Sequence, residues 1–152
     1  MIDTKLIKEL REMTQSGVLA CREALEKTGS DVKKAVELLR KQGIEKAARK
    51  AGREAGEGLV ESYIHTNGRV GAIVELRCET DFVAKNPEFK QVAHELAMQV
   101  ASMDPSNVDV LMAQSYIRDT NRTIADLIKE SIAKFGENIV VARFIRFSIG
   151  DS

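Results

Sequence analysis

Cys78-Glu79-Thr80-Asp81-Phe82-Val83-Ala84-Lys85-Asn86-Pro87 separates an apolar run from a helical pattern, and this stretch decides how the second half of the chain folds. Asn86 is a good N-cap, and Pro87 fits the first helical position, where a missing N–H costs nothing. Residues 80–84 should therefore connect a strand to a helix. Connectors lie mostly at the surface, so a carboxylate followed by a large aromatic ring is unusual there. From the residues alone, Phe82 either folds back into the core or is held out for a partner.

The composition is that of a globular protein with one domain and a small appendage. The 152 residues are 43% hydrophobic and 30% charged, and 23 basic residues balance 23 acidic ones. No surplus of positive charge therefore favours nucleic acid or an anionic membrane as a partner. The apolar runs are far shorter than the roughly 18 residues that span a bilayer, and no secretory signal opens the chain. Two isolated cysteines fit a reducing compartment, so we expect a cytoplasmic protein.

Residues 1–43 predict three short helices, at about 4–14, 18–27 and 32–42, with Gly43 as the residue that ends the third. Three helices in some forty residues bury little area, so this unit should dock onto something else. The helical spacing predicts three apolar stripes, namely Leu6, Ile7, Leu10 and Met13, then Val18, Cys21, Ala24 and Leu25, then Val32, Ala35, Val36, Leu38 and Leu39.

Residues 44–58 are Ala-rich and charged and then Gly-rich, which favours a helical continuation that frays into a linker. After Gly58 the apolar period becomes two, with strands expected at 59–65 and 69–78 and a hairpin turn at Asn67-Gly68. Helices are expected at 87–103 and from about 120–123 to Gly136, with 108–116 ambiguous, and a last strand at 139–147. Residues 59–152 thus predict a β-β-α-α-β core with a three-stranded antiparallel sheet, so the fold class is α+β.

The sheet of this core should have one uncovered face, because helices on one side bury only the other. The second strand places Ile73 there, and the last strand is apolar on both faces. We assign Ile139, Val141, Ile145 and Phe147 to the uncovered face and Val140, Ala142 and Phe144 to the inner one. Exposed apolar patches of this size mark interfaces, so we expect a homodimer with twofold symmetry. Alternatively, the last strand is central and covered by its own chain.

The residues offer little for covalent chemistry. His65 and His94 are far apart in sequence and lack metal-ligand spacing, and there is no phosphate-binding glycine loop. A nucleophilic pair of Cys78 with His65 could be imagined, but nothing supplies an orienting third group or an oxyanion site. We therefore expect no catalytic residue, no bound metal and no cofactor.

Several segments resemble the elongation factor Ts family of bacteria. The first is Leu10-Arg11-Glu12-Met13-Thr14-Gln15-Ser16-Gly17-Val18-Leu19-Ala20-Cys21-Arg22-Glu23-Ala24-Leu25, followed by Gly29-Ser30-Asp31-Val32-Lys33-Lys34-Ala35 and Leu38-Leu39-Arg40. The second is Cys78-Glu79-Thr80-Asp81-Phe82-Val83-Ala84, and the last is Arg143-Phe144-Ile145-Arg146-Phe147 with Gly150. The chain departs from the family where Val18 and Leu19 replace Met and Ala20 replaces an acidic residue. It is similar to the short, single-core class, in which two chains supply what one long chain has.

The resemblance implies a translation factor that exchanges guanine nucleotide on elongation factor Tu. It implies that the first three helices form a ubiquitin-associated-like bundle that docks on the GTPase through Arg11, Val18 and Leu19. It also implies that Phe82 points outward and that the factor leaves when GTP binds. The segment it associates with dislodging Mg²⁺ from the GDP complex is Thr80, Asp81, Phe82 and Val83. The competing function is an adaptor whose helical bundle binds a ubiquitin-like or other small protein.

Overall fold

The computed structural model describes residues 2–14 and 16–150. The chain divides into two compact units, Met1–Arg49 and Lys50–Ser152, and each is described by itself. Gln15, which belongs to the first signature segment, lies outside the described residues.

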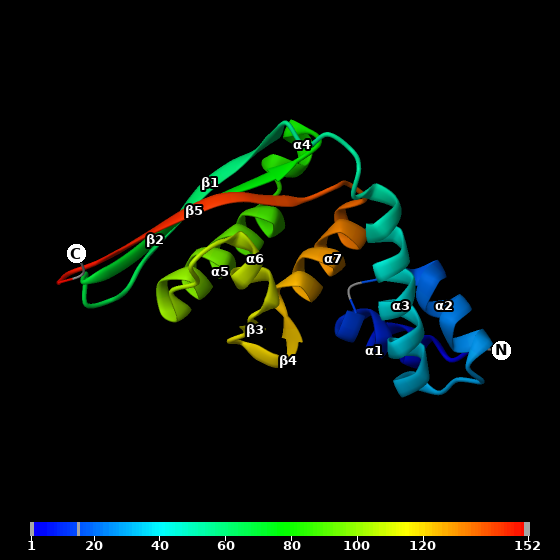
Figure 1. The fold of residues 1–152 in the computed structure, drawn as a ribbon. Helices are drawn as coiled ribbons and strands as arrows, with labels where there is room; N and C mark the ends of the chain where they lie inside the picture. The colour runs from blue at the N-terminus through cyan, green and yellow to red at the C-terminus, as the bar shows by residue number, and fades with distance from the viewer. Residues whose placement is uncertain (1, 15, 151–152) are drawn as a thin grey trace. The chain divides into compact units, whose positions relative to one another are not determined.

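The first unit is built from α1 (Thr4–Thr14), α2 (Val18–Lys27) and most of α3 (Val32–Lys50), as Figure 1 shows. The starts and ends predicted for α1 and α2 are confirmed. Two residues of the predicted stripes are instead exposed, Met13 by 55% and Val18 by 52%. The buried cluster consists of Leu10, Cys21, Ala24, Leu25, Ala35, Val36 and Leu39.

The third helix does not end at Gly43, where a helix-ending residue was predicted, but continues to Lys50, in agreement with the helical continuation expected within residues 44–58. A glycine inside a helix costs about 1 kcal/mol relative to alanine. The seven residues that follow Gly43 include Ala47, Ala48 and several long charged side chains, which are good helix formers. Their combined preference outweighs the single unfavourable position.

The second unit is a three-stranded antiparallel sheet with helices on one face, which confirms the predicted α+β class. Its strand order is β1-β2-β5, from β1 (Glu57–Ile64), β2 (Val70–Cys78) and β5 (Val140–Ser148). Figure 1 shows α5 (Pro87–Met103) and α7 (Ile124–Phe135) on the same side of the sheet. The core between these layers is apolar and includes Ala72, Val74, Leu76, Phe89, Leu96, Val100, Ile124 and Ile128.

Asn86-Pro87 and Gly136 mark helix ends as the sequence predicted, and the structure adds a cap at the start of α7. The Asn86 side chain accepts a hydrogen bond from the Glu88 N–H at 2.9 Å, and Pro87 occupies the first turn of α5. Thr123 and Asp126 form a capping box at the start of α7. Gly136 ends that helix with φ +74°, a left-handed conformation that glycine adopts without a Cβ clash.

The residues at the start of β5 lie on the opposite faces of the sheet from those that the sequence predicted. The pairing of β2 with β5 shifts between Glu75, opposite Arg143, and Leu76, opposite Val141. This irregularity inserts one residue into β5 and reverses the faces on its N-terminal side. Ile139 and Val141 are therefore buried, at 3% and 5% exposed, whereas Val140 faces outward.

The uncovered face of the sheet, which we call the outer face, carries Ile73, Ile145 and Phe147 as predicted. Its large exposed side chains are Val60, Ile64, Ile73, Val140, Ile145 and Phe147. Glu75 lies among them and pairs with Arg77 at 2.6 Å and with Arg143 at 3.0 Å. The outer face is thus apolar with one cluster of paired charges.

A short hairpin of β3 (Ser115–Tyr116) and β4 (Asp119–Thr123) occupies part of the segment that the sequence left ambiguous. It follows α6 (Val108–Ala113). Buried Gln99 of α5 holds it by donating to the Ser115 carbonyl and accepting from the Ile117 N–H, each at 3.0 Å. Polar groups of one core helix therefore fix this hairpin.

Within residues 2–14 and 16–150, no helix is long and apolar enough to cross a membrane.

Candidate partner-binding site

The connector singled out by the sequence contains a single-turn helix, α4 (Asp81–Ala84). Thr80 caps it, since its side-chain oxygen accepts a hydrogen bond from the Val83 N–H at 3.4 Å. The Phe82 ring is 85% exposed, so the outward alternative is the one that the structure shows. Asp81 is also exposed, and its contact with Lys85 at 3.5 Å is a surface ion pair that contributes little. An aromatic ring and a carboxylate from two consecutive residues are thus both exposed to solvent.

The carboxylate of Glu137 anchors the start of this helix. One oxygen accepts hydrogen bonds from the N–H groups of Glu79 at 3.1 Å and Thr80 at 3.0 Å. The other accepts the Thr80 hydroxyl at 2.6 Å. Hydrogen bonds to an ionised acceptor are stronger than neutral ones, so three of them make a firm attachment.

Glu79 and Asn138 form a second attachment next to the first. Glu79 accepts a hydrogen bond from the Asn138 N–H at 2.6 Å, and the Asn138 side chain donates to the carbonyls of Ala51 at 3.3 Å and Arg53 at 2.7 Å. The Arg53 guanidinium lies 3.8 Å from the Glu79 carboxylate. The start of α4, the start of β5 and the segment after Lys50 are therefore joined by polar contacts within one unit.

Sequence reasoning missed Glu137 and Asn138. Their contacts join residues 57 to 87 positions apart, and periodicity cannot detect such pairs. One signal was available, because two polar residues stand between the helix-ending Gly136 and an apolar strand. Asn138 is 4% exposed, and a polar side chain that is so buried needs partners.

Cys78 is a structural residue and not a nucleophile. It is fully buried, and its thiol donates to the Thr80 carbonyl at 3.1 Å. Burial, followed by the negative charge of Glu137, raises the pKa of the thiol to about 11, which keeps it protonated. His65 is at the opposite end of the hairpin, since it follows Ile64 opposite Gly71 whereas Cys78 pairs with Glu57. The imagined pair of Cys78 with His65 is therefore absent from the described part of the chain.

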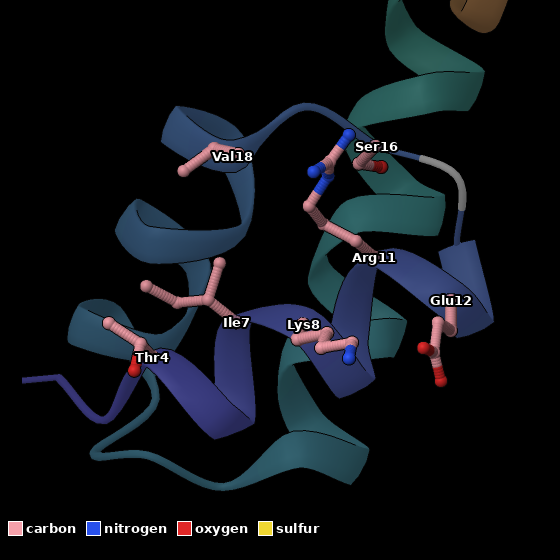
Figure 2. Close-up of a pocket in the computed structure, with 7 residues that line it drawn as sticks. All are labelled: Thr4, Ile7, Lys8, Arg11, Glu12, Ser16 and Val18. Atoms are coloured by element: carbon pink, nitrogen blue, oxygen red, sulfur yellow. The ribbon is translucent and has the colours of Figure 1, made fainter.

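A second candidate site lies in the first unit, where an open groove of about 520 Å³ runs along α1 and the start of α2. Arg11 and Val18, both expected to contact a partner, line it, whereas Leu19 is 66% exposed beside it. Figure 2 shows Arg11 reaching toward Ser16 while Glu12 points away. The structure thus brings Arg11 and Val18 to one groove, whereas Leu19 is not among its lining residues. The full lining is Thr4, Ile7, Lys8, Arg11, Glu12, Ser16 and Val18.

The two sites offer exposed side chains that another protein could contact. Among residues 2–14 and 16–150, no cluster of three or more His, Cys, Asp or Glu side chains could hold a metal ion. The imidazole of His65 contacts the Tyr63 hydroxyl at 3.1 Å, which is an ordinary surface hydrogen bond. The exposed ring of Phe82, the exposed carboxylate of Asp81 and the exposed aliphatic side chains of Val18 and Leu19 are features that a protein partner could recognise.

Comparison with known proteins identifies relatives along nearly the whole chain. Elongation factor Ts of Thermosipho melanesiensis is 39% identical over 196 aligned residues, covering 99% of this chain and 100% of the relative. The chain belongs to the elongation factor Ts family. The match to elongation factor Ts of Thermoanaerobacter sp. is 40% identical and covers 99% of the chain and 96% of the relative. The family model for elongation factor Ts matches residues 79–152, which include α4.

Membership in the elongation factor Ts family makes the chain a translation elongation factor and bears out the resemblance seen in its sequence. Elongation factor Ts of a Nostoc species is 47% identical over 150 residues, which cover 99% of this chain but 47% of that relative. The alignment with the Thermosipho protein is longer than the chain itself. The Thermosipho relative therefore carries segments that have no counterpart in this sequence.

Proposed function

We propose that the chain is a guanine nucleotide exchange factor for elongation factor Tu, without covalent chemistry of its own. It binds the GDP complex and promotes GDP release by dislodging Mg²⁺. The observation that carries this proposal is the 85% exposure of Phe82 beside Asp81 on an anchored single-turn helix. An exposed phenyl ring on a fixed element is suited to insertion into another protein, because the partner gains its burial while this chain loses little order.

Docking is assigned to the first unit. Val18 and Leu19 are exposed by 52% and 66%, and the guanidinium of Arg11 borders the same groove. Exposed aliphatic side chains next to an arginine suit an apolar patch of the GTPase with an acidic neighbour. These contacts supply affinity, and they bring the second unit to the nucleotide-binding domain.

Exchange is assigned to α4. GDP in a GTPase is held through Mg²⁺ and backbone donors around its phosphates. Insertion of Phe82 into the partner would stabilise an opened state by about 1.5–3 kcal/mol, the value of burying one large apolar side chain. Asp81 competes for the groups or waters that hold the ion. Each ~1.4 kcal/mol lost from nucleotide binding weakens it tenfold, so this one insertion accelerates release appreciably.

Departure of the factor follows from linkage. If the factor weakens nucleotide binding, then nucleotide weakens binding of the factor by the same ratio. GTP, which enters the emptied pocket together with Mg²⁺, restores the closed state and expels Phe82. The factor is then free to act on another GDP complex.

The active species is proposed to be a homodimer joined through the outer faces of the two sheets. Sheets pack face to face at about 10 Å, and a twofold axis brings the same patch of each copy together. The exposed side chains of Ile73, Ile145 and Phe147 would then be buried against their counterparts. Cys78 lies on the inner face and is fully buried, so it is not available for a bridge across this interface.

The deciding experiment is nucleotide release. Elongation factor Tu loaded with fluorescent mant-GDP is mixed with excess GDP, with and without the chain, and the fluorescence decay is followed by stopped flow. The proposal expects a release rate that rises with the concentration of the chain and then saturates. An unchanged rate, together with binding of the chain to a ubiquitin-like or other small protein, would favour the adaptor function instead.

A further inference from the structure

We propose that Glu137 is a positioning residue for nucleotide exchange, which holds Thr80 so that α4 presents Asp81 and Phe82 to the partner. The inference rests on the proposed function. Glu137 itself lies between α7 and β5 and acts only through the segment that it anchors.

The hydroxyl of Thr80 is the centre of this arrangement. A hydroxyl has a single proton, and here that proton is donated to Glu137 at 2.6 Å. The lone pairs of the same oxygen are thereby left to accept from the Val83 N–H at 3.4 Å. Glu137 thus sets the direction in which the capping hydroxyl faces, and the cap in turn sets the first turn of α4.

The short helix packs against β1, β2 and α5, but its own side chains remain partly or fully exposed. None of Asp81, Phe82, Val83 and Ala84 is buried. A single helical turn is unfavourable by itself, because several backbone dihedrals are fixed for one hydrogen bond. The direction of the Phe82 ring therefore depends on the residues that fix Thr80, and Glu137 makes three of those contacts.

A second pair of residues, Glu79 and Asn138, joins the same two segments in the opposite sense. Glu79 and Thr80 are consecutive, and so are Glu137 and Asn138. Glu137 accepts from the backbone of Glu79 and Thr80, while Glu79 accepts from the backbone of Asn138 at 2.6 Å. Two carboxylates thus reach in opposite directions between the same two segments, which resists both sliding and rotation of the connector.

The test separates positioning from docking. In Glu137→Ala the docking residues of the first unit are untouched. Glu137→Ala removes all three charge-assisted hydrogen bonds, so we expect the maximal mant-GDP release rate at saturating factor to fall about tenfold or more, with a nearly unchanged half-saturating concentration. Glu137→Gln retains a carbonyl for the two N–H groups but reverses the hydrogen bond to the Thr80 hydroxyl, so its rate should lie between those of Glu137→Ala and the wild type. Glu130→Ala removes a paired carboxylate of α7 that contacts Arg122 and serves as the matched control.

A double-mutant cycle gives the decisive readout. If Glu137 acts only through Asp81 and Phe82, then Glu137→Ala should cost little further rate in a chain that already carries Asp81→Ala and Phe82→Ala. An equal loss in both backgrounds, or no loss in the first, would overturn the inference. A wild-type chain that fails to accelerate release would instead overturn the proposed function, so the two failures are distinguishable.

Hydrogen exchange tests the same inference without the GTPase. Amides of Val83, Ala84 and Lys85 should exchange faster in Glu137→Ala than in wild type, whereas those of α5 should be unchanged. If Glu137→Ala does not fold, Glu137→Asp, which keeps the charge but is one methylene shorter, is measured in its place. Equal protection of the α4 amides in the folded variant and the wild type would contradict the inference.

Discussion

Ile73 on β2 lies directly opposite Ile145 on β5, and both side chains stand on the face of the sheet that the helices do not cover. They are 41% and 50% exposed. With Phe147, exposed by 66%, they make an apolar surface that water solvates poorly.

The first prediction concerns self-association through this outer face. Ile145→Asp should convert a dimer to a monomer, because each interface would acquire two unpaired buried charges. Size-exclusion chromatography with light scattering measures the mass directly. Val110→Asp changes an exposed aliphatic residue of α6, which is not part of the outer face, and should leave the mass unchanged. A wild-type chain that is monomeric at all accessible concentrations would contradict the proposed dimer.

The second prediction concerns the exchange motif. Phe82→Ala should lower the maximal rate of mant-GDP release by about tenfold or more, since the burial of its ring is lost. Asp81→Ala should also lower the rate. Neither change should alter the urea midpoint of unfolding, because both side chains are exposed. Met103→Ala, which shortens a residue exposed by 49%, is the control, and release as fast in Phe82→Ala as in the wild type would contradict the insertion.

The third prediction concerns docking by the first unit. Leu19→Ala and Arg11→Ala should raise the half-saturating concentration of the factor, by about tenfold for the leucine, with little change in the maximal rate. Ile44→Ala, in the same unit and 47% exposed, provides the comparison. If the two alanine variants change only the maximal rate, the assignment of docking to the first unit and of exchange to α4 is wrong.

The fourth prediction concerns pH. Hydrogen bonds from Arg77 and then Arg143 lower the pKa of Glu75 below its ordinary value of 4.5. A carboxyl group with a lowered folded-state pKa stabilises the fold above its unfolded pKa, and that contribution disappears as the pH falls through the folded value. The difference in unfolding free energy between wild type and Glu75→Gln should therefore be greatest near neutral pH and shrink below about pH 4.5. Urea titrations across this range measure it, and a pH-independent difference would contradict the assignment.

The fifth prediction concerns the thiols. Burial raises the pKa of Cys21 and of Cys78, the latter to about 11. Because the thiolate is the reactive form, the folded chain should react slowly with a disulfide reagent at pH 8, whereas the urea-unfolded chain should react quickly at both cysteines. Rapid modification of the native chain would show that the structure opens around these residues.

Local signals in the sequence were sufficient for most element boundaries. Asn86-Pro87 marked the start of α5, Asn67-Gly68 marked the hairpin, and Gly136 marked the end of α7. Each of these depends on the backbone preferences of a few adjacent residues, which no distant contact reverses.

Features that depend on distant residues were missed. The inserted residue in β5 reversed the faces of Val140 and Val141, because register is set by pairing with β2. The hairpin of β3 and β4 is held by Gln99, which precedes it by 16 residues or more. Glu137 was overlooked for the same reason, although the motif that it anchors could be found from the resemblance.

The pairing of Glu75 with Arg77 and Arg143 has a consequence for recognition. One carboxylate faces two guanidinium groups within a single chain, so the cluster keeps a net positive charge, and a covering surface must supply a counter-ion or leave an arginine in water. A cover that disrupted either pair would strand a charge in a dry environment, at a free-energy cost of several kcal/mol. The apolar residues around the cluster make covering favourable, while the cluster admits few alignments. The charged cluster therefore restricts how a covering surface can align on the outer face, and it adds specificity to an otherwise general apolar attraction.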